Sequence, residues 1–261
     1  METLKTFTPA ETHLILDSWR TEYKDLLKYT FLDLLCKKVL QLNTHEYDLE
    51  VTGKREQAEY ISQGVNFDQY KPKPHEQAFL EPFKGNPDIE ILLTLLVKMI
   101  REKIYTRKNY VFNYMLRDQK MRELVKRGTW QWLFGVISFT DRGFAIREHL
   151  RRETRELNRS LPRLIENEPE KAAVLMSQIG GNVYLLSSMD SDLLKKAGEA
   201  FANKELRDSS LSDAFVFDGL GDSFDSSTSF DAGFDASGDS GGSGCGGSGC
   251  GGGCGGGCGG S

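Results

Sequence analysis

Every Lys and Arg of this chain lies at or before Arg207, and this boundary separates two parts that cannot fold alike. Residues 1–207 carry 33 basic and 30 acidic residues, a net charge of about +3, in an ordinary globular composition. Residues 208–261 carry eight Asp, 18 of the 27 Gly and four of the five Cys. That composition has too little apolar surface to offset the entropy lost on ordering. We therefore expect a folded part over 1–207 and a disordered tail over 208–261.

The first helix of the folded part is predicted by a capping box. Thr8-Pro9-Ala10-Glu11 lets the Thr8 hydroxyl and the Glu11 carboxylate each accept a hydrogen bond from the other's amide, with Pro9 at the first helical position. Two further helices are expected near 22–28 and 30–38. Apolar residues at 39–42 and 47–51 flank a polar turn at 43–46, which predicts a β-hairpin. Three helices and a hairpin indicate a winged-helix-like module over 1–63.

The same order of elements is expected again after a proline-rich linker at 64–87. Helices are predicted over 88–107, 110–116 and 118–127, followed by a strand or hairpin at 129–140. These elements form a second winged-helix-like module over 88–145, and a C-terminal helical segment follows over 146–207. The predicted fold class is therefore mostly α, with tandem winged-helix-like modules, small β-hairpins, C-terminal helices and a disordered tail.

Sequence signals of an enzyme are missing from the folded part. It has no HExxH, no phosphate-binding glycine loop and no GxSxG elbow, and no base is positioned in sequence near Cys36. We therefore predict a protein without enzymatic activity. Its longest apolar stretches, 89–100 and 130–139, are about half of the ~20 residues that a membrane helix needs. No membrane span, no secretory signal and a cytoplasmic location are expected.

A basic region is the strongest sequence signal for a nucleic-acid partner. Residues 98–163 hold 17 Lys and Arg against seven acidic residues. Six arginines in and just after the long helix expected at 142–161 could neutralise phosphates: Arg147, Arg151, Arg152, Arg155, Arg159 and Arg163. Interleaved glutamates fit a solvated, ion-paired helix face equally well. The predicted recognition helix at 31–38 is mostly apolar, so a DNA-binding regulator is the alternative function and not the favoured one.

The tail divides into two segments. Residues 208–240 repeat an aromatic-acid pair in a Ser/Gly background: Phe217-Asp218, Phe224-Asp225, Phe230-Asp231 and Phe234-Asp235. Disordered acidic segments with spaced aromatic residues act as adhesive elements, because the acids keep them solvated while the rings insert into pockets. The basic surface of 98–163 is one expected partner. In the DNA-binding alternative, the acidic segment competes there with nucleic acid.

The second segment, 241–261, holds Cys245, Cys250, Cys254 and Cys258 among only Gly and Ser. Four thiolates could close on one soft ion such as Zn²⁺ or Cu(I). Against metal binding, no CxxC pair is present, and polyglycine loses more entropy on ordering than any other chain. Thiol modification by an enzyme, crosslinking, attachment and a plain tether are the other interpretations. The favoured function is thus a non-enzymatic interaction protein that presents this segment to a protein partner or modifying enzyme.

A resemblance rests on several of these segments together. Thr8-Pro9-Ala10-Glu11, the run at 34–42, the segment 172–181 followed by Val183-Tyr184-Leu185-Leu186, and the Gly/Cys terminus are similar to an uncharacterised family of bacterial proteins. That family joins winged-helix-like segments to a Gly/Cys-rich low-complexity C-terminal tail. The resemblance implies the same architecture here and brings no activity. Many members carry membrane spans, and this sequence departs from them in having none.

Overall fold

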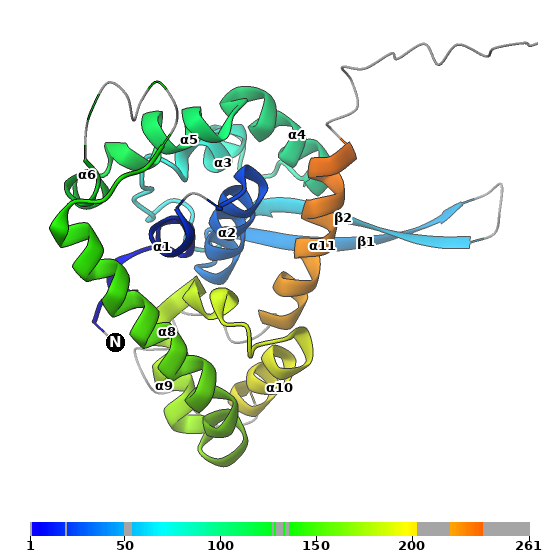
Figure 1. Cartoon of the computed structure of the whole chain (residues 1–261). Coiled ribbons are helices and arrows are strands. Elements are labelled where there is room, and N and C mark those ends of the chain that lie inside the picture. Colours follow the sequence, from blue (N-terminus) through cyan, green and yellow to red (C-terminus); the bar gives the residue numbers. More distant parts are fainter. Residues whose placement is uncertain are drawn as a thin grey trace, which may run out of the picture.

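The computed structural model describes residues 2–18, 20–49, 54–126, 128, 133, 136–202 and 220–236. Its helices surround one core and a small sheet stands at one side (Figure 1). The α-helices are α1 (Pro9–Asp17), α2 (Tyr23–Cys36), α3 (Gln77–Leu80), α4 (Leu93–Ile104), α5 (Arg107–Asn113), α6 (Gln119–Leu124), α8 (Asp141–Asn167), α9 (Pro169–Ile179), α10 (Ser191–Ala202) and α11 (Leu220–Ala236). Short 3-10 turns are η1 (Leu4–Thr6), η2 (Glu81–Phe83), η3 (Met115–Arg117) and η4 (Gly180–Leu185), and the strands are β1 (Leu40–Leu49), β2 (Lys54–Gln63) and β3 (Ile91–Leu92).

The capping box at the start of α1 is confirmed. The amide of Thr8 donates to Glu11 Oε2 at 2.8 Å, and the amide of Glu11 donates to Thr8 Oγ1 at 3.4 Å. Two of the amides that a helix leaves without partners at its N-terminus are satisfied in this way. Helix α1 therefore begins where the sequence predicts.

Helix α2 replaces the two short helices predicted at 22–28 and 30–38. Thr30 resembles an N-cap in sequence, but inside α2 its hydroxyl donates to the Leu26 carbonyl at 2.8 Å, so the helix continues through it. Leu27 and Phe31 are buried on the face that packs on the core. The predicted order of three helices before the hairpin is therefore wrong, and the tandem winged-helix arrangement is not confirmed.

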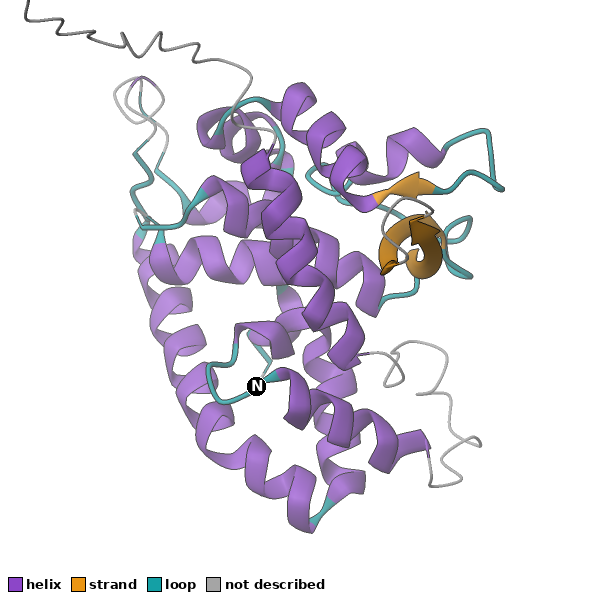
Figure 2. Ribbon diagram, turned by 90° about the vertical axis from the view of Figure 1, so that its right-hand side faces the viewer, coloured by secondary structure: helices purple, strands orange, loops and turns teal. Residues whose placement is uncertain are grey.

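The hairpin is present, but the predicted position of its turn is wrong. Strand β1 runs straight through the expected turn at 43–46 and pairs antiparallel with β2, from Leu40 opposite Gln63 to Leu49 opposite Lys54. Strand β3, expected to be the start of a helix, adds a third strand through Ile61 opposite Ile91. Most of the hairpin stands away from the helices, seen along its length in Figure 1 and end on in Figure 2. Polar residues can therefore occupy the middle of β1.

The C-terminal half is helical, as predicted, with several corrected boundaries. Helices α4, α5 and α6 lie close to the predicted ranges, whereas half of the strand expected at 129–140 lies outside the described residues. Helix α8 runs through Pro162 instead of ending before it, at the loss of one backbone hydrogen bond. Helices α9 and α10 lie within the predicted C-terminal helical segment, and the 3-10 turn η4 follows α9 directly.

The largest correction concerns the acidic segment predicted to be disordered over 208–240. Its residues 220–236 form α11, which packs against α2, α4 and α10 (Figure 1). Phe230 is 1% exposed and belongs to the same hydrophobic core as Leu4 and Leu194. This segment therefore buries apolar surface, although its composition alone predicts disorder. The rest of 208–240, and the whole Gly/Cys segment 241–261, lie outside the described residues. Within the described ranges, no helix combines the length and apolarity needed to cross a membrane.

Candidate functional site

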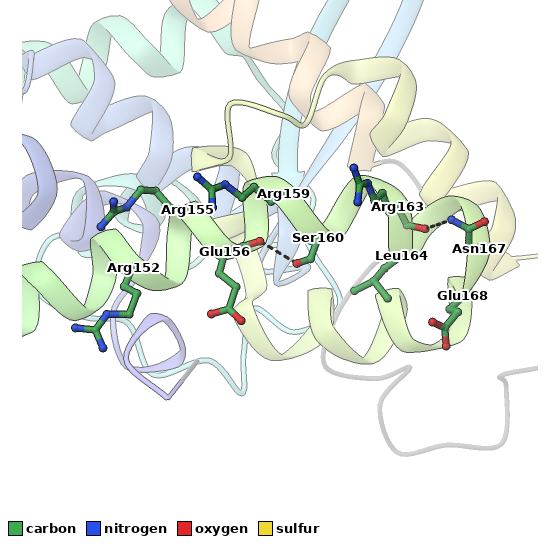
Figure 3. A pocket seen from close by; sticks show the side chains of 9 residues that line it. All are labelled: Arg152, Arg155, Glu156, Arg159, Ser160, Arg163, Leu164, Asn167 and Glu168. Atoms are coloured by element: carbon green, nitrogen blue, oxygen red, sulfur yellow. Dashed lines mark hydrogen bonds between the residues drawn. The ribbon is translucent and has the colours of Figure 1, made fainter.

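Four of the six predicted arginines meet on one surface of α8. Arg152, Arg155, Arg159 and Arg163 line a hollow of about 680 Å³ near the α8–α9 turn (Figure 3). Their spacing of three or four residues brings them to the same side of the helix. We call these four residues the arginine face. The structure thus brings together four of the six arginines that the sequence singled out.

The arginine face is exposed and carries a net positive charge. Among the described residues, none of its guanidinium groups forms an ion pair with a carboxylate, and Arg155 Nε donates to the Arg151 carbonyl at 3.2 Å. Two carboxylates, Glu156 and Glu168, also line the hollow. Four positive charges against two negative ones leave a surface that attracts anions.

The other two predicted arginines do not join this face. Arg147 donates from Nε and Nη2 to the Leu16 carbonyl, at 3.0 and 2.6 Å, and so fastens α8 to the end of α1. Arg151 pairs with Glu148 at 2.9 Å. Both guanidinium groups are therefore less available to an external phosphate than the four guanidinium groups of the arginine face.

One of the interleaved glutamates also has a structural role. Glu153 accepts hydrogen bonds from the amides of Leu4, at 2.9 Å, and Thr3, at 3.3 Å. Burial raises the pKa of this carboxyl, and the two amides and the N-terminal amino group outweigh that effect and lower it. Glu153 therefore ties the N-terminal segment to α8 and does not neutralise the arginine face.

A second charged surface lies under α11, where the sequence placed none. Phe230 stacks on Phe31 of α2 with ring centroids 5.4 Å apart, and Phe234 meets Tyr23 edge to face at 5.6 Å. The guanidinium of Arg101 lies 4.7 Å from the Phe234 ring centroid and donates to the Phe234 carbonyl at 2.7 Å. Aromatic contacts of this geometry add stabilisation beyond the area that they bury.

Ion pairs flank these aromatic contacts. Lys24 Nζ donates to Asp235 at 3.0 Å, Lys28 Nζ donates to Asp231 at 3.2 Å, and Lys195 Nζ donates to Asp225 Oδ2 at 2.6 Å. The hydrogen bond that Lys24 donates to Asp235 is the main cause of the raised pKa of Lys24. Three of the cations facing α11 therefore come from outside the range 98–163 that the sequence proposed as its partner. Arg101 is the contact from inside that range.

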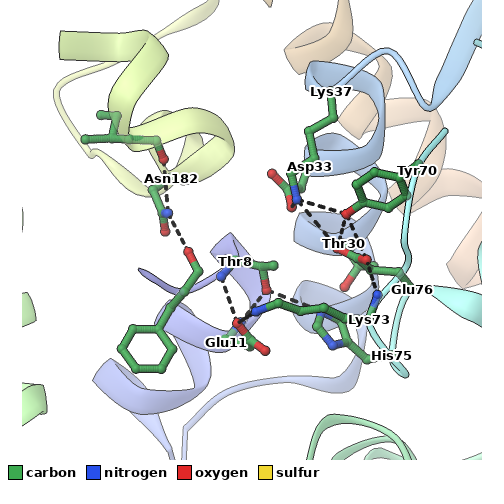
Figure 4. Close-up of polar contacts among 12 residues, drawn as sticks. Thr8, Glu11, Thr30, Asp33, Lys37, Tyr70, Lys73, His75, Glu76 and Asn182 are labelled. Carbon is green, nitrogen blue, oxygen red and sulfur yellow. Dashed lines mark hydrogen bonds and ion pairs between the residues drawn. The ribbon is translucent and has the colours of Figure 1, made fainter. Parts of the chain in front are cut away.

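A buried network of charged groups joins α1, α2 and the loop at 70–76 (Figure 4). Its three buried carboxylates each have a donor: Lys73 Nζ reaches Glu11 Oε2 at 2.6 Å, Lys37 Nζ reaches Asp33 Oδ2 at 2.6 Å, and the Tyr70 hydroxyl reaches Glu76 at 2.9 Å. Lone buried carboxylates would be strongly destabilising, whereas paired ones hold three segments in a fixed arrangement.

Burial dominates the acid–base properties of this network. It raises the pKa of the Asp33 carboxyl, against the opposing effect of the Lys37 ammonium. His75 is buried, with Nε2 3.3 Å from the Thr8 hydroxyl, and its Nδ1 has no hydrogen-bond partner among the described residues. Because the three carboxylates and His75 are buried, their arrangement is that of a structural network.

The five cysteines differ sharply in their environment. Cys36 is buried in α2, and burial, with a smaller effect of Asp33, raises its pKa well above the usual range. Such a thiol is inert, because the thiolate is the reactive form. Cys245, Cys250, Cys254 and Cys258 lie outside the described residues. In the part of the chain that is described, no group of His, Cys, Asp or Glu is placed to hold a metal ion.

The arginine face was predictable from the sequence because its residues are three or four positions apart. The surface under α11 was not predicted, because its residues lie far apart in the chain. Lys24 and Lys28 are four residues apart, as are Asp231 and Asp235, so each pair marks one helix face. That matched spacing was the signal available in the sequence. The buried network gives no comparable signal, because helix and strand segments separate Glu11, Asp33 and Glu76 along the chain.

Comparisons of the chain with protein-family models, with curated proteins and with solved structures found no match.

Proposed function

We propose that this is a non-enzymatic interaction protein whose helical body anchors α11 and thereby presents the Gly/Cys segment that follows it. The segment would serve thiol modification, attachment or capture of a soft metal such as Zn²⁺ or Cu(I), through a protein partner or a modifying enzyme. A cytoplasmic location, where thiols remain reduced, is part of this proposal.

The docking of α11 is the observation that supports the proposal most. Arg101 holds the Phe234 carbonyl two residues before α11 ends at Ala236, and the Gly/Cys segment begins at Gly241. The segment therefore follows closely on a helix end that is fixed to the body. Apart from the buried Cys36, its thiols are the only ones in the chain, so a thiol-directed partner would act there selectively.

The test is the intact mass of the full chain purified from the cells that naturally make it. A mass increase that peptide mapping assigns to 241–261, or Zn or Cu bound in stoichiometric amount, is expected. A variant with Ser at Cys245, Cys250, Cys254 and Cys258 should lose that increase and that metal, while Cys36 stays unmodified in both proteins. An unmodified and metal-free mass would leave only a plain tether and would contradict the proposal.

The arginine face supports a second candidate, binding of nucleic acid. Four exposed guanidinium groups around one hollow match the repeated charges of a phosphate backbone. If all four neutralise phosphates, the affinity should fall about a hundredfold between roughly 50 and 200 mM salt. Docked α11 lies against α2, α4 and α10, so in this candidate the acidic segment need not compete with nucleic acid for the arginine face.

A titration of duplex DNA with the full chain at those two salt concentrations tests this candidate. Arg159→Glu should weaken binding and lower the salt slope, whereas Arg142→Glu is the matched control, because Arg142 lies on the same helix outside the hollow and pairs with Glu123. An affinity that does not change with salt, or equal loss in the two variants, would exclude the arginine face as a nucleic-acid site.

A further inference from the structure

The surface under α11 has the layout of a recognition groove. We define the α11 groove by seven residues of α2, α4 and α10 that contact α11: Tyr23, Lys24, Lys28, Phe31, Thr94, Arg101 and Lys195. The rings of Tyr23 and Phe31 form two aromatic contact sites, which we call aromatic seats, and Lys24 and Lys28 lie beside them. The aromatic pair and the lysine pair each contact a matching pair of residues on α11. Phe230 and Phe234 occupy the aromatic seats, and their neighbours Asp231 and Asp235 meet the lysines.

The match depends on helical spacing on both sides. Phe230 and Phe234 are four residues apart, and so are Asp231 and Asp235, so the aromatic and acidic pairs lie side by side on one helix. Lys24 and Lys28 repeat the same interval on α2. A helix with a different interval could fill one aromatic seat and reach one lysine, but not both pairs at once. The groove therefore selects a spacing as well as a composition.

A third element of selection is the close approach at Gly233. A Cβ on Gly233 would lie 3.0 Å from Thr94 Cα and 3.3 Å from its Cβ, tighter than normal van der Waals contact. Only a very small residue fits between the two aromatic anchors at this position. The pattern that the groove accepts is thus Phe-Asp-x-small-Phe-Asp, with α4 as the wall that enforces the small residue.

The present occupant of the groove is a poor helix by its own sequence. Eleven of the 17 residues of α11 are Gly, Asp, Ser or Thr, all of which disfavour helix interiors. Asp235 lies near the C-terminus of the helix, where a negative charge opposes the helix dipole. An isolated helix of this length and composition would not persist in water. Its helical form therefore depends on its contacts with the groove, above all on the burial of Phe230.

From these contacts we infer that the α11 groove is a receptor for an acidic aromatic helix of a partner protein, and that α11 is its internal, displaceable occupant. The partner carries the Phe-Asp-x-small-Phe-Asp pattern on a segment with better helix-forming residues at the outward positions. Such a helix makes the same contacts and loses less conformational entropy on folding. This difference offsets the high effective concentration that covalent linkage gives to α11. This inference rests on the proposed function, because it names the partner class for the helix that presents the Gly/Cys segment.

A synthetic peptide of residues 220–236 with Ser227, Thr228 and Ser229 replaced by Ala is the probe. These three side chains are not buried, so the replacements strengthen the helix and leave the anchors unchanged. In the unmodified full chain, excess peptide should speed amide hydrogen exchange of 220–236 at least tenfold, because the peptide displaces α11. A control peptide that also carries Phe230→Ala and Phe234→Ala should leave that exchange unchanged.

A second variant tests the groove directly. In the full chain, Asp231→Lys with Asp235→Lys should release α11, and the labelled peptide should then bind at least tenfold more tightly than it binds the unmodified chain. Adding Lys24→Glu and Lys28→Glu to this variant should abolish peptide binding and restore protection of 220–236, because both charge pairs are then reversed together. The restored protection also shows that the quadruple variant folds.

Three results would overturn the inference: exchange that excess peptide does not change, equal effects of the two peptides, and equal peptide binding by the released and the charge-reversed chains. None of these measurements depends on the tail cysteines. A tail without modification or metal would refute the proposed function and leave the receptor groove standing. A modified or metal-bound tail together with any of these three results would refute the receptor groove alone.

Discussion

Phe230→Ala gives the sharpest measure of how strongly α11 is held. The side chain is 1% exposed and stacks on Phe31, so its removal leaves a cavity inside a buried aromatic pair. Truncation of a buried Phe to Ala costs about 3–5 kcal/mol. Because α11 forms few helix-favouring interactions of its own, this loss should fall on the docking of α11 more than on the stability of the body. A loss of about 3 kcal/mol raises the open population about a hundredfold.

Limited digestion with chymotrypsin, which cleaves after aromatic residues, measures that population when opening is fast compared with cleavage. Cleavage within 220–236 should accelerate about a hundredfold in Phe230→Ala, while the urea midpoint of the body changes much less. Phe144→Ala is the control, because Phe144 is half exposed on α8 and is not part of the α11 groove. If the urea midpoint falls strongly and cleavage within 220–236 stays slow, α11 is an integral part of the core and the reasoning is wrong.

Three other predictions concern separate parts of the molecule. Gly181→Ala would place a Cβ 2.6 Å from Asp33 Oδ1, so we expect a loss of about 1–3 kcal/mol in urea unfolding. Cys36 should react with a thiol reagent only at the rate of global unfolding, as peptide mapping of labelled native protein would show. Lys195 lowers the pKa of Asp225, so this ion pair stabilises docking above the ordinary Asp pKa of about 4 and is lost as the pH falls through the lowered value. The protection of 220–236 against hydrogen exchange, taken relative to the intrinsic exchange rate at each pH, should therefore fall at acid pH, and Asp225→Asn should reduce that dependence.

Features set by neighbouring residues were predictable from the sequence. The capping box fixes the start of α1, and spacing of three or four residues brings the arginine face together. Each feature depends on contacts between residues a few positions apart, and the types and spacing of those residues determine such contacts.

Features set by distant residues were not predictable. Thr30 has the same local sequence whether it caps a helix or donates back to Leu26, and packing on the core decides between the two. Arg147 belongs to the basic stripe by spacing, but a carbonyl 131 residues away takes its guanidinium. Composition predicts disorder for 220–236 because it cannot count the apolar surface that α2 and α4 supply to α11.

The pairing of Phe31 with Phe230 has a consequence for the timing of synthesis. The two rings are 199 residues apart, so at about 5–20 residues per second the ribosome needs roughly 10 to 40 seconds to deliver the second ring after the first. Helix α2 can form within microseconds, long before that. During this interval the growing chain carries Phe31 without the ring that covers it in the folded protein, flanked by Lys24 and Lys28.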